Sequence, residues 1–233
     1  MPATTVADAL HRATAVLAHA EQRPSQDRMA EAVAAAIGSQ RHLIVQAGTG
    51  TGKTLAYLVP AILAGTRCVV STATKALQDQ LASKDLPLLS EALPLPVRFA
   101  VLKGRSNYVC RQRVAELGGG DQLPLDDGRP VSTGQLGREV QRLMSWATTA
   151  DTGDRAELAW EPSAAAWEQV SVGPRDCPGA SRCPSGGVCF AEAARQRAAE
   201  ADVVVVNTSL YVTHLAAGGE VLPQHDLVVF DEA

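Results

Sequence analysis

The stretch Gln46–Thr54, QAGTGTGKT, decides the fold expected for this chain. It follows a short apolar run, HLIVQ (42–46), and precedes a segment of helical character, KTLAYLVPAILAG (53–65). A strand, a glycine-rich turn and a helix in this order are the context that a phosphate-binding P-loop requires. Glycines let the backbone aim its N–H groups at a phosphate, and the helix adds the positive end of its dipole. The stretch therefore predicts a nucleotide site, with an ordinary glycine-rich turn as the alternative.

The loop and the last residues of the chain supply a set of candidate site residues. Lys53 is expected to reach the β- and γ-phosphates of ATP, and Thr54 to give an oxygen to Mg²⁺. The run LVVFDEA (227–233) ends in two carboxylates, which alone is a weak signal but fits a P-loop well. We expect Asp231 to hold Mg²⁺ through water, and Glu232 to orient and deprotonate the attacking water. The expected loop contacts to the nucleotide are Ala47, Gly48, Thr49, Gly50, Thr51, Gly52, Lys53 and Thr54, with Ala47 where the strict pattern has glycine.

Apolar runs alternate with helical segments along much of the chain. The β-branched runs typical of buried parallel strands are RCVVST (67–72), VRFAVL (97–102), DVVVVN (202–207) and DLVVF (226–230). Helices are expected at 5–20, at 25–37 with Ser25 as N-cap, and at 75–86. This alternation predicts an α/β fold with a parallel sheet, a P-loop NTPase (RecA-like) domain.

Residues 103–200 differ in character and read as an insert between two strands of that sheet. They contain GGGDQLPLDDGRP (118–130), which reads as a loop, and two helical segments, QLGREVQRLMSWA (135–147) and FAEAARQRAAEA (190–201). We therefore divide the chain into a nucleotide-binding domain, 1–102 with 201–233, and a mostly helical insert, 103–200.

Composition limits the classes of protein to consider. The formal net charge is −4, so a surface for nucleic acid must be local. Neither a secretory signal nor an apolar run of about 18 residues is visible, so we expect a cytoplasmic location without membrane contact. In a reducing compartment the five cysteines are not expected to form structural disulfides.

Four of the five cysteines have the character of ligands. Cys68 lies among valines and reads as a small buried residue. The others are Cys110, Cys177, Cys183 and Cys189, the last three at equal spacing in CPGASRCPSGGVC. Four thiolates can hold zinc or a [4Fe–4S] cluster. The absence of paired CxxC knuckles favours the cluster on spacing alone, while zinc and unliganded thiols stay open.

Several segments in order resemble a known family. They are AGTGTGKT (47–54), STATKALQDQL (71–81), LKGRSNYVC (102–110), the cysteine triplet, AEADVVVVNTSLYV (199–212) and the final DEA. Together they resemble the first motor domain of iron–sulfur superfamily 2 helicases of the DinG/XPD type, from about residue 20 to 233. Two departures are Thr208, where the family has histidine after asparagine, and the missing last residue of the DEAH motif.

The resemblance implies an ATP-dependent 5′ to 3′ DNA helicase that acts on single-stranded DNA or forked duplex in repair or replication. It implies that the four cysteines ligate a [4Fe–4S] cluster and that Gln26 reads the adenine, unless Gln26 is a solvated helix residue. Thr72 and Thr74 resemble the motif that grips strand phosphates. The expected cofactors are ATP, Mg²⁺ and the cluster.

A basic stretch next to Cys110 is a candidate path for DNA. It contains five Lys and Arg residues and no acidic residue between Arg98 and Arg113. On the residues alone, a solvated helix face is the usual interpretation of such a stretch. The resemblance, in which the cluster domain lines the pore for one strand, implies that Arg105 and Tyr108 contact DNA, through phosphate pairing and base stacking.

The sequence also leaves other functions open. It stops at Ala233 without a second motor domain, so we expect a truncated chain that is inactive or weakly active alone. The alternatives are a non-catalytic module that binds nucleotide and nucleic acid, or a P-loop NTPase with a zinc site made of four cysteines. A P-loop kinase is weaker, because it leaves the cysteines unexplained.

Overall fold

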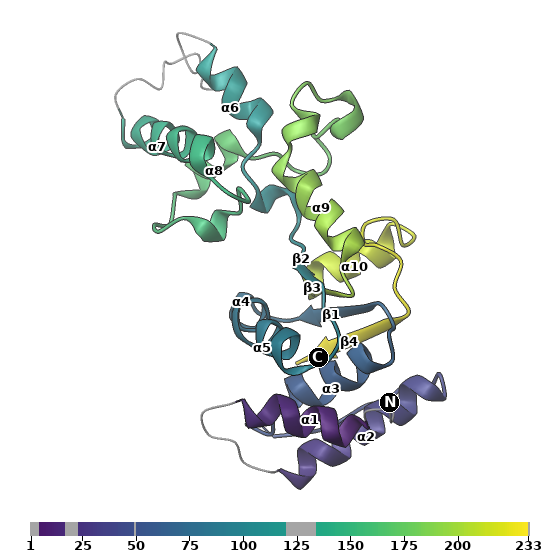
Figure 1. The fold of residues 1–233 in the computed structure, drawn as a ribbon. Coiled ribbons are helices and arrows are strands. Elements are labelled where there is room, and N and C mark those ends of the chain that lie inside the picture. Colours follow the sequence, from purple (N-terminus) through teal and green to yellow (C-terminus); the bar gives the residue numbers. More distant parts are fainter. Residues whose placement is uncertain (1–4, 17–22, 49, 120–133, 233) are drawn as a thin grey trace. The chain divides into compact units, whose positions relative to one another are not determined.

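The computed structural model describes residues 5–16, 23–48, 50–119 and 134–232, and divides the chain into two compact units. The first unit combines Met1–Leu102 with Arg197–Ala233, and the second is Lys103–Gln196 (Figure 1).

The first unit is built on a parallel four-stranded sheet, with strand order β2-β3-β1-β4. Its strands are β1 (Cys68–Thr72), β2 (Phe99–Val101), β3 (Val203–Asn207) and β4 (Leu227–Asp231). In register, Thr72 lies beside Asn207 on one side and beside Asp231 on the other, so the carboxyl ends of these strands meet at one edge. The predicted α/β fold, with a RecA-like arrangement of helices and parallel strands, is confirmed.

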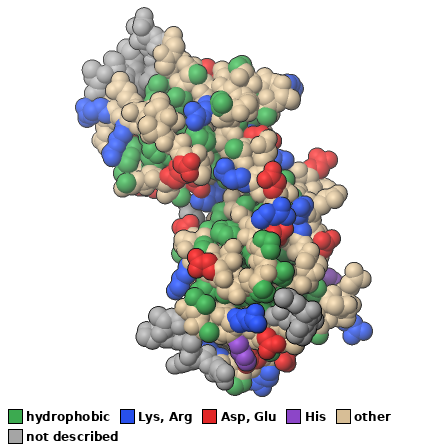
Figure 2. All heavy atoms as spheres, viewed as in Figure 1, with side chains coloured by type: hydrophobic (Ala, Val, Ile, Leu, Met, Phe, Trp, Pro, Cys, Tyr) green, Lys and Arg blue, Asp and Glu red, His purple; other side chains and the backbone are tan. Residues whose placement is uncertain are grey.

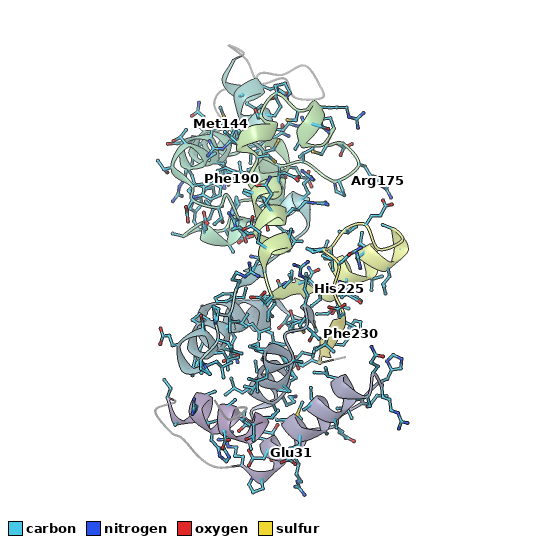
Figure 3. All side chains as sticks on the ribbon, turned by 45° about the vertical axis from the view of Figure 1, so that its right-hand side comes forward. Glu31, Met144, Arg175, Phe190, His225 and Phe230 are labelled. Atoms are coloured by element: carbon cyan, nitrogen blue, oxygen red, sulfur yellow. The ribbon has the colours of Figure 1, made fainter. Side chains whose placement is uncertain are left out.

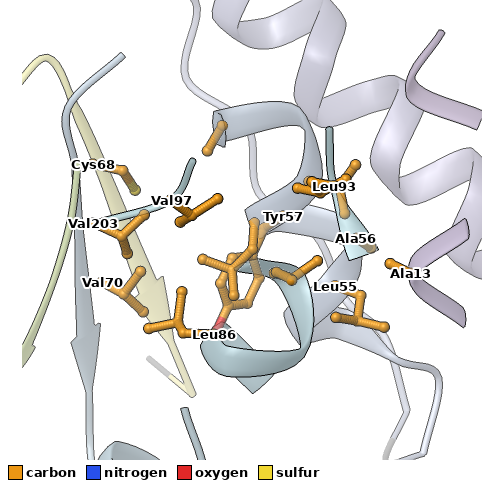
Figure 4. Packing of buried hydrophobic residues seen from close by; sticks show 14 of the residues in the cluster. Ala13, Leu55, Ala56, Tyr57, Cys68, Val70, Leu86, Leu93, Val97 and Val203 are labelled. Carbon is orange, nitrogen blue, oxygen red and sulfur yellow. The ribbon is translucent and has the colours of Figure 1, made fainter. Parts of the chain in front are cut away.

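The helices of the first unit follow the apolar pattern of the sequence. They are α1 (Val6–Ala15), α2 (Pro24–Gly38), α3 (Lys53–Leu63), α4 (Lys75–Gln80), α5 (Leu86–Ala92) and α10 (Thr208–Ala216), with a π-helical turn at Leu81–Asp85. Helix α3 is buried continuously from Leu55 to Ala61 and packs in one core with α1, α5 and the strands (Figure 4). It is followed by Gly65, whose φ of 64° is left-handed, a conformation that glycine adopts without steric cost.

The two faces of the sheet are covered by different elements, because side chains alternate along a strand. Cys68 and Val70 of β1 face the core that contains α3, whereas Val69 is fully buried outside that core. Helix α10 contacts β1 and β3 and carries part of a ring cluster that includes Phe230 and His225 (Figure 3). The interpretation of Cys68 as a small buried residue is confirmed, and burial raises the pKa of its thiol to about 12.

The expected strand at 42–46 is wrong. Residues 41–48 contain no strand, and Ile44 is 97% exposed. A strand needs a neighbour to satisfy its backbone groups, and none of the four described strands pairs with this run. An apolar run reports the preference of its side chains but not the presence of a partner.

Two helix boundaries also differ from expectation. The N-cap of α2 is Arg23, and Pro24 takes the first helical position, so Ser25 lies inside the helix. Proline suits that position because its missing N–H is not needed there. The expected helix 75–86 is interrupted by the π-helical turn, which separates α4 from α5.

The regular elements of the second unit are helical throughout its described residues. They are α6 (Arg111–Gly118), α7 (Gln135–Thr149), α8 (Ala164–Val170) and most of α9 (Phe190–Glu200), with short 3-10 turns between them. Helices α7 and α8 share a small core around Leu143 and Trp167, and the Trp146 and Trp167 rings lie 6.4 Å apart. The expected loop 118–130 lies outside the described residues from 120 onward. Among the described helices, none has both the length and the apolarity to cross a membrane.

Candidate nucleotide site and cysteine region

The glycine-rich loop has the backbone conformation that its sequence predicts. Gly50 and Gly52 both have a φ of 75°, and Gly52 is the N-cap from which α3 starts. The Thr51 hydroxyl donates a hydrogen bond to the carbonyl oxygen of Gly48 at 2.9 Å, which closes the turn. Lys53 and Thr54 therefore begin α3, where N–H groups of the first helical turn have no partner within the helix. The expected contact by Thr49 lies outside the described residues.

Helix α2 is held against this loop by two side chains. The Gln26 amide donates a hydrogen bond to the carbonyl oxygen of Gly52 at 3.0 Å, and the Arg23 guanidinium donates to the carbonyl oxygen of Gly50. A Cβ atom at Gly52 would lie 2.2 Å from the Gln26 amide nitrogen. Gln26 is only 5% exposed, so it is not a solvated helix residue. Its contact with adenine stays a prediction, and Arg23 is a loop contact that motif reasoning missed.

Asp231, at the end of β4, contacts helix α3 through the side chain of Tyr57. The Tyr57 hydroxyl donates a hydrogen bond to Asp231 Oδ2 at 3.0 Å, and the Thr54 hydroxyl also interacts with it. Burial, and then the negative charge of Asp231, raises the pKa of Tyr57, so the phenol keeps its proton. The structure therefore brings together the two residues expected to hold Mg²⁺, Thr54 and Asp231, around one hydroxyl.

Two more carboxylates lie near the end of β4. Asp85 belongs to the π-helical turn, and its pKa is raised mainly by burial and also by the charge of Asp231, against lowering by Gln80 and Lys84. Sequence reasoning missed Asp85, because it lies inside a segment expected to be a plain helix. Glu232 is exposed and has a φ of 60°, which is unusual for a residue with a side chain.

The two threonines expected to grip DNA have different environments. Thr72 is fully buried, and its single hydroxyl proton has two carbonyl oxygens as possible acceptors, Thr74 at 3.3 Å and Val206 at 3.4 Å. Thr74 is exposed and caps α4, where its hydroxyl accepts a hydrogen bond from the Leu77 N–H at 3.3 Å. Only the second hydroxyl lies at the surface.

The basic stretch is largely engaged with groups from elsewhere in the chain. Arg98 pairs with Asp202 at 2.8 Å within the first unit. In the second unit Lys103 pairs with Asp154 at 2.6 Å, and Arg105 with Glu192 at 3.5 Å. The Arg111 guanidinium lies 4.2 Å from the centre of the Phe190 ring, and Arg113 is exposed. Lys, Arg, Asp and Glu side chains are interspersed on the face shown in Figure 2.

Tyr108 lies in the interior of the second unit. It is 3% exposed, and its hydroxyl accepts a hydrogen bond from the Lys103 N–H at 3.2 Å. Its backbone forms a bridge with Asp154, the partner of Lys103. The ring is therefore part of the packing of this unit.

The four candidate ligand cysteines are half-buried and carry no disulfide. Burial raises the pKa of the Cys110 thiol, backbone N–H groups lower it, and the charges of Cys183 and Cys189 raise it further. Cys183 and Cys189 thus lie close enough to Cys110 for their charges to act on its thiol. Across the described ranges, no group of three or more His, Cys, Asp or Glu is close enough to hold a metal ion.

The loop that carries these cysteines is fixed to α6. The Ser185 hydroxyl donates a hydrogen bond to the side-chain oxygen of Gln112 at 2.9 Å. Gln112 lies in α6, two residues after Cys110. A Cβ atom at Gly186 would lie 2.0 Å from the carbonyl oxygen of Ala180, so the backbone folds back on itself here. This fold brings the 3-10 turns before and after Cys183 together.

Comparison with known proteins agrees with the geometry of the loop. The model of the DEAD/DEAH box helicase family matches residues 23–118, which include Gln26, the glycine-rich loop and Cys110. The chain is similar to DinG helicases. It is 48% identical over 225 residues to ATP-dependent helicase DinG of Mycobacterium tuberculosis H37Rv, a match that covers 91% of this chain and 34% of that protein.

Other relatives extend this similarity. The chain is 42% identical over 218 residues to ATP-dependent DNA helicase YoaA of Escherichia coli K12, covering 91% of the chain and 32% of YoaA. It is 33% identical over 220 residues to the 3′-5′ exonuclease DinG of Bacillus subtilis, covering 91% of the chain and 22% of that protein. The resemblance to DinG-type helicases is thereby confirmed. The chain spans about a third or less of the length of these relatives.

Proposed function

We propose that the chain is the ATP-binding part of an ATP-dependent DNA helicase that acts 5′ to 3′ on single-stranded DNA or forked duplex in repair or replication. The observation that carries this proposal is the meeting of Asp231 with the first turns of α3 through Tyr57, directly after the glycine-rich loop. Residues 1–102 with 201–233 would form the first motor domain, and 103–200 its insert. A second motor domain, outside this chain, would close over the nucleotide.

In this proposal the chain's own residues bind and orient the triphosphate. Backbone N–H groups of the loop and the start of α3 point at the phosphates, and Lys53 adds its charge at the transferred group. Thr54 would supply an oxygen ligand for Mg²⁺, and Asp231 would hold the ion through water; the bound ion would neutralise phosphate charge. Glu232 would orient the attacking water, and Gln26 would contact the adenine from its place beside Gly52.

The proposed DNA contacts rest most firmly on Thr74, whose hydroxyl is exposed at the start of α4. A phosphate contact by Arg105 would compete with its ion pair to Glu192. Contacts by Thr72 and Tyr108 would require both to leave their buried positions. We therefore expect substitution of Thr74 to weaken DNA binding more selectively than substitution of the other three.

We also propose that Cys110, Cys177, Cys183 and Cys189 hold a [4Fe–4S] cluster. The proposal is supported by four thiols of similar exposure without disulfides, and by the nearness of Cys183 and Cys189 to Cys110. A cube bound at four corners fits separated sulfur atoms better than one metal ion does, which favours iron–sulfur over zinc held by the same four cysteines. The cluster would cross-link the insert.

The test of the main proposal uses the longer protein that carries this chain with its remaining domains. Wild type should hydrolyse ATP faster when single-stranded DNA is added, and should unwind a fork with a free 5′ strand. Lys53→Ala should abolish both activities while it leaves DNA binding in place. If Lys53→Ala hydrolyses ATP at the rate of wild type, the proposed site is wrong.

The chain by itself provides the second comparison. We expect it to bind ATP and to hydrolyse it slowly or not at all, because the proposed mechanism needs charges that a second domain would add. If the longer protein is equally inert and both still bind DNA, the non-catalytic module is the better description.

A further inference from the structure

Tyr57 is the one polar side chain in the buried run of α3. The run Leu55–Ala61 is otherwise made of leucine, alanine, valine and proline, and Tyr57 is 3% exposed within it. A buried hydroxyl needs a hydrogen-bond partner. Here the partner is Asp231 Oδ2, at 3.0 Å, in a residue 174 positions later in the chain.

The position of Tyr57 on α3 explains why its hydroxyl reaches the loop. Residues three apart on a helix lie on the same face, and helical side chains lean toward the N-terminus. Tyr57 therefore points back toward Thr54, whose hydroxyl interacts with the phenol. The sheet supplies the other partner, because β4 pairs with β1 and ends at Asp231.

We propose that Tyr57 is a positioning residue for Mg²⁺ at the nucleotide site, which holds the Asp231 carboxylate and the Thr54 hydroxyl in their binding orientation. This inference rests on the proposed function, in which those two residues bind the ion. The hydrogen bond to Oδ2 fixes the rotation of the carboxylate and leaves Oδ1 for the metal or its water. Groups that orient metal ligands in this way commonly change metal affinity by about 10–100-fold when they are removed.

The surroundings favour this role over simple packing. Asp85 lies close enough for its charge to act on both Tyr57 and Asp231, so a second carboxylate competes for any donor in the region. The phenol is already committed to Asp231, while Asp85 accepts a hydrogen bond from the Gln80 amide at 3.0 Å. Each carboxylate thus has its own donor, and the orientation of Asp231 depends on Tyr57.

The test is Tyr57→Phe, which keeps the ring in its packed position and removes only the hydroxyl. The chain would be titrated with Mg²⁺ in the presence of a fluorescent ADP analogue, and nucleotide binding would also be measured with a chelator. We expect the half-saturating Mg²⁺ concentration to rise about 10–100-fold, and nucleotide binding in the presence of the chelator to stay unchanged. Tyr211→Phe is the matched control, since its hydroxyl lies 3.3 Å from His225 Nε2 instead.

A double-mutant cycle adds a second criterion. Asp231→Asn should weaken Mg²⁺ binding, and Tyr57→Phe should weaken it little further in the Asp231→Asn background, because both act through one contact. Full additivity of the two changes would overturn the inference. So would Mg²⁺ dependence like that of wild type in Tyr57→Phe, or equal losses with and without Mg²⁺, which indicate a merely structural role.

A measurement on the unaltered sequence covers the case in which Tyr57→Phe does not fold. The chain has three tyrosines, so 3-fluorotyrosine labelling gives three fluorine resonances, two of them assignable by Tyr108→Phe and Tyr211→Phe. The Tyr57 resonance should move when Mg²⁺ is added to the nucleotide-bound chain, and an unmoved resonance would overturn the inference. If nucleotide binding shows no dependence on Mg²⁺ even in wild type, the proposed function fails and the inference fails with it.

Discussion

The side-chain amide of Gln26 donates a hydrogen bond to the carbonyl oxygen of Gly52, 3.0 Å away, and occupies the space where a Cβ at position 52 would lie. This contact joins α2 to the first residue before α3. Gly52 is thus constrained twice, by its left-handed backbone and by the amide packed on it.

Gly52→Ala should therefore destabilise the first unit. A left-handed φ costs a residue with a Cβ about 1–3 kcal/mol, and the Gln26 amide must also move. Urea unfolding would measure the change. Gly38→Ala is the control, because Gly38 ends α2 without a positive φ and with open space around it. Equal stabilities of the two variants would contradict this account.

Stability should fall in mild acid because of His214. Burial, and then the charge of His225, lowers the pKa of His214 below its ordinary value of 6.5. His214 Nδ1 accepts a hydrogen bond from the Leu222 N–H at 3.0 Å, which requires an unprotonated nitrogen. As pH falls through 6.5 the unfolded chain takes up a proton that the folded chain does not, so the free energy of unfolding decreases.

The measurement is urea unfolding at several pH values on either side of 6.5, the ordinary pKa of the histidine. Above that value both states are neutral at His214, and its contribution is constant. His214→Asn should flatten the acid side of the profile, although it lowers stability at neutral pH. An unchanged slope in His214→Asn would assign the acid sensitivity to other groups.

The ion pair of Lys103 and Asp154 should stabilise the second unit more than the exposed pair of Arg98 and Asp202 stabilises the first. The side chains of Lys103 and Asp154 are 13% and 18% exposed, whereas those of Arg98 and Asp202 are 66% and 40% exposed. Lys103→Met leaves a largely buried carboxylate without its cation, at a cost of about 1–3 kcal/mol. Arg98→Met should cost less, because solvent screens an exposed ion pair.

Thermal unfolding of both variants would compare the two pairs. The double variant Lys103→Met with Asp154→Asn should recover part of the loss, because no unpaired charge remains. If Arg98→Met is the more damaging change, exposure does not govern the strength of these pairs.

Iron content should depend on the proposed ligand cysteines. Protein purified without oxygen should carry iron and colour, and Cys183→Ser should lose both. Cys68→Ala is the matched control, because Cys68 is fully buried in β1 and distant in sequence from the triplet. One zinc per chain without iron would favour the zinc alternative, and iron retained by Cys183→Ser would remove that residue from the ligand set.

Much of the fold could be predicted from local sequence. The runs at 67–72 and 202–207 became β1 and β3 because segments rich in valine suit a strand buried on both faces. The glycine-rich loop and the start of α3 were predictable for the same local reason, since glycine adopts the backbone angles found at 50 and 52 without strain. The absence of a strand at 42–46 could not be predicted in this way, because this run has apolar residues but no described partner strand.

The basic stretch near Cys110 illustrates what local composition misses. No acidic residue lies between Arg98 and Arg113, yet Asp154, Glu192 and Asp202 reach its cations from distant parts of the chain. The charge of a surface depends on all residues that fold onto it, and a window of sequence contains only some of them. Tyr108 is likewise buried by residues from distant parts of the chain, such as Asp154, whose backbone it bridges.

The sequence by itself determined the glycine-rich loop, the valine-rich runs that can form buried strands and the two carboxylates after the last of these runs, because each depends on neighbouring residues and their backbone preferences. Only the tertiary structure decided that Tyr57 reaches Asp231, that Gln26 packs on Gly52, and which cations of the basic stretch are paired. These contacts join residues far apart in the chain, and no local preference encodes which distant side chain will complete a buried hydrogen bond.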